Sequence, residues 1–100
     1  MIIIAGILRI APADLPKVRA AAETVLRRTR EEDGCIVYSF AEDLLEPGLI
    51  RIYEEWESRE NLAAHGKSAH VDAWHRALET VTVLERDLDI IEAGAREALD

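Results

Sequence analysis

The sequence predicts an α+β domain in which one antiparallel sheet of four strands carries its helices on a single face. Three observations lead to this fold class. Four segments have the composition or alternation of strands, two longer stretches repeat apolar residues at helical spacing, and their order is β-α-β-β-α-β. This order is that of the ferredoxin-like fold. With 100 residues, no linker and no repeat, the chain is expected to form one domain over residues 1–100.

The first half of the predicted fold is a strand, a helix and a second strand. Residues 2–10 are rich in Ile on both sides, as in strands that are covered on both faces. Asp14 can cap a helix of about twenty residues, whose apolar stripe is Val18, Ala22, Val25, Leu26 and Thr29. Gly34 can end this helix, and residues 35–41 have strand composition.

The second half is predicted to contain a strand, an interrupted helix and a last strand. Pro47-Gly48 is a turn signal, so residues 49–56 should pair antiparallel with the preceding strand. Ser58 can cap a helix that Gly66 breaks and Ser68 restarts. Residues 83–91 alternate between apolar and acidic positions, with Arg86 as the exception on the apolar side, and the tail from Glu92 can form a short helix.

The apolar character of both sides of the first strand predicts a homodimer. Helices can cover only one face of the predicted sheet, and a chain this short buries only about 60–70% of its unfolded surface. A second copy is the economical cover for the remaining face.

Composition excludes several classes of function. Lys and Arg number 12 against 20 Asp and Glu, and this formal net charge of −8 argues against nucleic acid as a partner. No run of apolar residues is long enough to span a membrane. The single cysteine, Cys35, allows no disulfide within the chain and fits a reducing cytoplasm. The five scattered glycines form no phosphate loop, so no nucleotide, flavin or nicotinamide cofactor is expected.

The aromatic residues and histidines gather in the middle of the chain. All five aromatic rings lie between positions 38 and 74, where they either line a ligand pocket or fill the core. His65, His70 and His75 are spaced by five, whereas a zinc-binding helix uses a spacing of four, so no metal site is predicted. Glu54 shares its strand face with Ile50, Ile52 and Trp56. It is either a buried carboxylate with a raised pKa or the partner of an arginine.

One segment resembles the antibiotic biosynthesis monooxygenase domain. It runs Glu54-Glu55-Trp56-Glu57-Ser58-Arg59-Glu60-Asn61-Leu62-Ala63-Ala64-His65, with Ser68-Ala69-His70 after it and Asp33-Gly34-Cys35-x-x-Tyr38 before it. The resemblance covers nearly the whole chain and implies a dimeric α+β barrel with a ligand cavity between each sheet and its helices. It also implies oxidation of a small aromatic hydroquinone or phenol by dioxygen without a cofactor.

The resemblance also implies the residues of the site. His65 is expected as the base or anion-orienting group and Asn61 as a hydrogen-bond donor, although His65 stands where the actinorhodin-pathway monooxygenase has Trp. The expected substrate-binding residues are Tyr53, Trp56, Trp74, His70 and Glu54.

Two other functions remain open for the same cavity. One is a non-catalytic binding module for a small apolar metabolite, and the other is an acid–base isomerase for which His65 and Glu54 suffice. The haem-degrading branch of the superfamily uses an Asn on the first strand, which residues 2–10 lack, but His75 leaves haem binding open.

Overall fold

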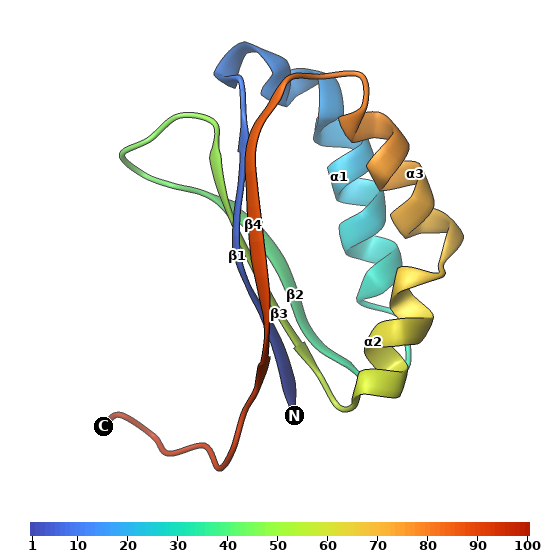
Figure 1. Ribbon diagram of the computed structural model, residues 1–100, viewed down its shortest axis with the longest axis vertical. Helices are drawn as coiled ribbons and strands as arrows, with labels where there is room; N and C mark the ends of the chain where they lie inside the picture. The colour runs from blue at the N-terminus through green and yellow to red at the C-terminus, as the bar shows by residue number, and fades with distance from the viewer.

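The computed structural model describes residues 1–100 and has the predicted α+β layers. One four-stranded sheet has the order β2-β3-β1-β4, and every neighbouring pair of strands is antiparallel. The helices lie together on one face of this sheet (Figure 1). The fold is therefore ferredoxin-like, as the order of elements predicts.

The four strands lie close to their predicted positions. They are β1 (Ile2–Ile10), β2 (Cys35–Glu42), β3 (Leu49–Trp56) and β4 (Val83–Glu92). Successive side chains of a strand point to opposite faces of the sheet. The even-numbered residues of β1 and β3 consequently face the helices, and the odd-numbered residues face away.

The helical segments are shorter than predicted and separate. They are α1 (Leu15–Thr29), α2 (Arg59–Gly66) and α3 (Ala69–Leu78). Ser58 and Ser68 cap α2 and α3 as expected, because each side chain accepts a hydrogen bond from a backbone N–H in the first turn. Gly66 is the last residue of α2, so the predicted interruption is confirmed.

Three local expectations are wrong. Helix α1 has 15 residues and ends at Thr29, before three consecutive acidic residues that the negative end of a helix dipole disfavours. Asp14 is the N-cap residue of α1, but its side chain makes no capping bond and instead accepts the backbone N–H of Thr82 at 2.9 Å. The chain after Glu92 forms no helix and leads away from the sheet (Figure 1).

The apolar core lies between the sheet and the helices and consists of two groups of buried side chains. The larger group joins the sheet to α1 and α3 and contains Leu8, Ile10, Val18, Val25, Ile52, Val71 and Trp74. The smaller group lies towards α2 and contains Ile2, Ile4, Tyr38 and Trp56. Helices α2 and α3 lie over this second part of the sheet, and a cavity lies between them and the strands.

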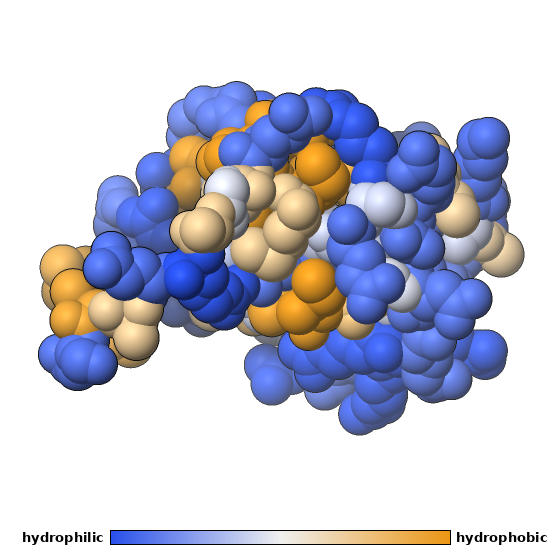
Figure 2. Space-filling view, turned by 90° about the horizontal axis from the view of Figure 1, so that it is seen from below, coloured by the Kyte–Doolittle hydropathy of each residue, from blue (hydrophilic) through white to orange (hydrophobic).

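The sheet face that the helices leave uncovered is only partly protected. Tyr53 of β3 is 37% exposed and Ile91 of β4 is 44% exposed on this face. Figure 2 views the lower end of the molecule and shows hydrophobic side chains there surrounded by hydrophilic ones. None of the three helices is long and apolar enough to cross a membrane.

Candidate active site

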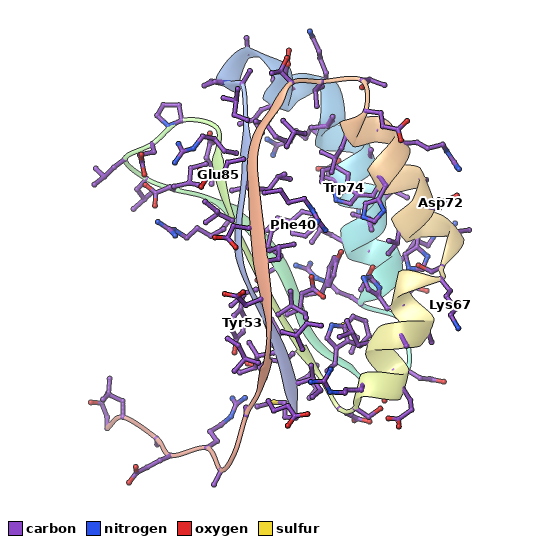
Figure 3. The ribbon with its side chains drawn as sticks, viewed as in Figure 1. Phe40, Tyr53, Lys67, Asp72, Trp74 and Glu85 are labelled. Atoms are coloured by element: carbon purple, nitrogen blue, oxygen red, sulfur yellow. The ribbon has the colours of Figure 1, made fainter.

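A cavity of about 380 Å³ lies between the sheet and the helices α2 and α3. Its walls are mostly apolar, and Phe40 of β2 and Trp74 of α3 both lie in the layer between sheet and helices (Figure 3). The ring centroids of these two residues are 5.5 Å apart. Five lining side chains on the helices or on the helix-covered side of the sheet carry titratable groups: Tyr38, Glu54, His65, His75 and Arg86.

His65 occupies the last turn of α2 and is the most buried histidine of the chain, with 7% of its surface exposed. Its Nδ1 atom lies 3.2 Å from both carboxylate oxygens of Glu32, which belongs to the turn between α1 and β2. Hydrogen bonding to a carboxylate requires a proton on Nδ1, so in the neutral ring the lone pair is on Nε2. The Nε2 atom has no hydrogen-bond partner within the protein and is not sealed from solvent.

The surroundings of His65 keep its ring neutral and fixed. Tyr38 and Trp56 pack against it, with ring centroids 5.1 Å and 4.7 Å away. Burial lowers the pKa of His65 below its usual value, although the hydrogen bond and the negative charge of Glu32 oppose this effect. Near neutral pH the group is therefore an uncharged imidazole that can accept a proton.

Glu54 is the second buried titratable group of the cavity. It lies on the helix side of β3 with 7% of its surface exposed, and its Oε1 atom accepts a hydrogen bond of 2.9 Å from the indole N–H of Trp56. Burial raises the pKa of Glu54, against the effect of that hydrogen bond. The sequence left open whether this carboxylate is buried or paired with an arginine. The structure places it in the cavity wall without an ion-pair partner.

Two exposed basic side chains lie at the mouth of the cavity. Arg86 of β4 and His75 of α3 both line the cavity, and both are exposed to solvent. Arg86 takes part in none of the ion pairs of the structure. Its guanidinium is free to contact an anionic group on a molecule that enters.

Asn61 does not line the cavity. It lies one turn before His65 on α2, and the spacing of four residues places the two on the same helix face. Its side-chain oxygen accepts a 2.6 Å hydrogen bond from the Ser58 hydroxyl, and the side chain lies against the backbone of Gly34. The amide is thus used in joining α2 to the turn between α1 and β2.

The expected binding residues are divided among three places. Trp74 and Glu54 line the cavity. Trp56 is fully buried behind it, and His70 contacts Oε1 of Glu32 from the first turn of α3. Tyr53 lies on the opposite face of the sheet, where its hydroxyl donates a 2.6 Å hydrogen bond to Glu55 (Figure 3).

Sequence reasoning missed Glu32 and considered Arg86 only as a candidate ion-pair partner of Glu54, a pair that the structure does not contain. Glu32 stands in an acidic stretch with no spacing that links it to His65, and only the packing of α2 against the turn brings them together. Arg86 was noted as the one charged residue on the apolar side of its strand, and that irregularity was a usable signal.

A second hollow, of about 640 Å³, is larger but chemically simpler. It lies between α1 and the sheet and contains no histidine. Its charged lining residues are Arg19, Glu23 and Glu42, none of which is buried. The smaller cavity is therefore the candidate active site, since it alone combines apolar walls with buried titratable groups.

Comparisons with known proteins agree with this fold. Residues 1–77 match the family described as antibiotic biosynthesis monooxygenase. A crystal structure of a protein named as a putative antibiotic biosynthesis monooxygenase from Deinococcus radiodurans is similar over 100% of this chain and 99% of that one, with 28% identity and a TM-score of 0.91. A conserved protein of unknown function from Bacteroides thetaiotaomicron is 27% identical, with a TM-score of 0.81 over 92% of this chain and 96% of that one.

A curated relative has no assigned activity. The uncharacterized protein sll1783 from Synechocystis is 34% identical over 64 residues, which are 64% of this chain and 44% of that protein. The matched segment thus spans less than half of that relative. The family match covers most of the present chain, from β1 to the last turns of α3, and the chain belongs to the antibiotic biosynthesis monooxygenase family.

Proposed function

We propose that the protein is a cofactor-independent monooxygenase that oxidises a small aromatic hydroquinone or phenol with dioxygen. The observation that carries this proposal is the buried, neutral imidazole of His65 in the wall of an apolar cavity, oriented by the carboxylate of Glu32. Membership of the monooxygenase family supports the reaction class.

The cavity fits the proposed substrate in size and lining. Its volume of about 380 Å³ is at the small end of the range for ligand pockets. The rings of Phe40 and Trp74 and the aliphatic side chains of Ile4, Leu8 and Leu88 offer the contacts that a flat aromatic molecule needs. A compound of one or two rings is the expected size class.

In the proposed mechanism, His65 acts as the general base. Nδ1–H donates to Glu32, and Nε2 accepts the proton of a substrate hydroxyl. The carboxylate of Glu32 then stabilises the imidazolium that forms. Arg86 at the cavity mouth supplies a positive charge for the phenolate.

The phenolate is the species that reacts with dioxygen. Ionisation raises the electron density of the ring, so that it can pass an electron to dioxygen without a flavin or a metal. For a hydroquinone, one oxygen atom is inserted into the ring and the other leaves as water with two hydrogens of the substrate. The product is a hydroxyquinone, and the substrate itself supplies all four electrons.

Oxygen uptake with a panel of hydroquinones and phenols in chelator-treated buffer tests this function. We expect turnover with some members of the panel and a loss of about 10²–10⁴-fold in the His65→Gln variant. A control is Lys67→Gln, which changes an exposed side chain just after α2 that does not line the cavity. Ligand-induced thermal stabilisation without oxygen uptake would instead indicate a binding module.

We further propose that the active protein is a homodimer whose copies cover each other's bare sheet face. The exposed apolar side chains on that face support this arrangement, and so does the small size of the chain. Light scattering after size-exclusion chromatography should give the mass of two chains. The mass of one chain at micromolar concentration would contradict the proposal.

A second candidate function is an acid–base isomerase. It is favoured by the presence of two buried groups in one cavity, Glu54 and His65, whose pKa values burial shifts in opposite directions. Such a reaction needs no dioxygen. Substrate conversion under argon at the rate seen in air would establish it and exclude the monooxygenase.

A further inference from the structure

We propose that Glu32, His65 and His70 form a binding site for a divalent cation of the Zn²⁺, Co²⁺ and Ni²⁺ class. The three side chains come from the turn before β2, the end of α2 and the start of α3. Their ligand atoms all lie within 4.8 Å of one another. The site shares His65 and Glu32 with the base proposed above, but its existence does not depend on that reaction.

The spacing of the ligand atoms suits a metal ion. His65 Nδ1 lies 3.2 Å from Glu32 Oε1, and His70 Nε2 contacts the same oxygen. Ligand atoms that are each about 2.1 Å from a metal are about 3.0 Å apart in octahedral geometry and about 3.4 Å apart in tetrahedral geometry. The 3.2 Å separation of His65 Nδ1 and Glu32 Oε1 falls between these two values.

The local structure holds the site in place and leaves it accessible. The exposed fractions of the side chains are 8% for His65, 18% for Glu32 and 20% for His70. The Ser68 hydroxyl donates a 2.7 Å hydrogen bond to the His65 carbonyl, which fixes the junction between α2 and α3. Because Glu32 and His70 keep some exposure, an ion can reach the site from solvent.

The chemistry of the ligands selects the class of metal. Two imidazole nitrogens and one carboxylate favour Zn²⁺, Co²⁺ or Ni²⁺ over Ca²⁺ and Mg²⁺, which take oxygen ligands. Three protein ligands leave at least one coordination position open, as in zinc sites that bind water or a small ligand. The net charge of −8 and the neighbouring carboxylates of Glu31 and Asp33 attract cations to this end of the molecule.

A bound metal would compete with the proposed base. The metal would take Nδ1 of His65, and a metal-bound imidazole carries its proton on the other nitrogen. Nε2 would then have no lone pair for the substrate. Metal occupancy is therefore expected to lower oxygen uptake, and removal by a chelator to restore it.

The test uses tag-free protein from which metals have been removed with a chelator. One titration adds Co²⁺ and measures its visible absorption, and a second adds Zn²⁺ and measures the heat of binding by calorimetry. We expect one ion per chain, with a dissociation constant in the micromolar range or below, and no displacement by Mg²⁺. His70→Ala and Glu32→Gln should each weaken binding by about 100-fold or more. His75→Ala is the matched control, because it removes a histidine of the same helix outside the cluster.

Two outcomes would overturn the site. One is the absence of saturable binding at millimolar Co²⁺ and Zn²⁺, which would leave the cluster a hydrogen-bonded Glu-His pair only. The other is an equal loss of affinity in His75→Ala and His70→Ala. Far-UV circular dichroism shows which variants remain folded. If His70→Ala is not folded, His70→Gln is measured in its place. Oxygen uptake is measured separately, so failure of metal binding is distinguishable from failure of the monooxygenase proposal.

Discussion

Replacement of Gly34 by alanine tests how firmly the turn that carries Glu32 is joined to α2. Gly34 has φ of +77°, a conformation that costs an alanine about 1 kcal/mol. A Cβ atom there would lie 2.2 Å from Cγ of Asn61, so the amide must move and lose its hydrogen bond with Ser58, worth about 1 kcal/mol. The variant should therefore lose about 2–3 kcal/mol of unfolding free energy.

Urea unfolding followed by tryptophan fluorescence measures this loss, since Trp56 and Trp74 are both buried. A loss of this size lowers Tm by roughly 10–20 °C in a domain of this length. Gly66→Ala is the matched control, because its φ is not positive and nothing lies within 4 Å of its added Cβ. Alanine in that helical position should raise stability by up to about 1 kcal/mol.

A double variant shows whether Asn61 is the cause. Gly34→Ala combined with Asn61→Ala should cost less than the sum of the two single changes, because the second removes the side chain that the first displaces. A free energy of unfolding for Gly34→Ala within about 0.5 kcal/mol of the parent value would refute this explanation, and so would strict additivity of the two changes.

Three further predictions concern the cavity and the bare face. Burial raises the pKa of Glu54, so the charged form of this carboxylate destabilises the folded state. Glu54→Gln should therefore raise the free energy of unfolding by about 1 kcal/mol near neutral pH, and urea unfolding should show that this gain is lost in acid, where Glu54 is protonated. Arg86→Gln should raise KM for phenols about tenfold in oxygen-uptake assays. Arg76→Gln is the control and should leave KM unchanged, because Arg76 pairs with Asp72 outside the cavity. Ile91→Arg should lower the mass found by light scattering to one chain, whereas Leu44→Arg in the exposed loop between β2 and β3 should leave it unchanged.

The strands and helix starts were predictable because they depend on local patterns. Alternation of apolar side chains determines which residues of β3 face the helices, and a Ser before a helical stripe satisfies free backbone N–H groups. The length of α1 was overestimated because its apolar spacing was weighed without the acidic residues that follow it. The tail after Glu92 carries helix-forming residues, but apart from the ion pair of Arg96 with Glu55 its side chains are largely exposed, so little packing stabilises a short helix.

The candidate site was only partly predictable because it depends on contacts between distant segments. Spacing along α2 places Asn61 and His65 on one face, but Asn61 meets Gly34 whereas His65 meets the cavity. Alternation along β3 already places Tyr53 and Glu54 on opposite faces of the sheet. For Tyr53, this alternation was therefore a better guide to position than the family resemblance. Glu32 lies 33 residues from His65, and no local pattern links them.

The most direct test of the account is the fate of isotopically labelled dioxygen in a single turnover with a hydroquinone that the protein consumes. We expect one labelled oxygen atom in the quinone product and one in water. The rate should be unchanged in the presence of a chelator, and His65→Gln should form no detectable labelled quinone. Product without label, or product formed equally well under argon, would contradict the account.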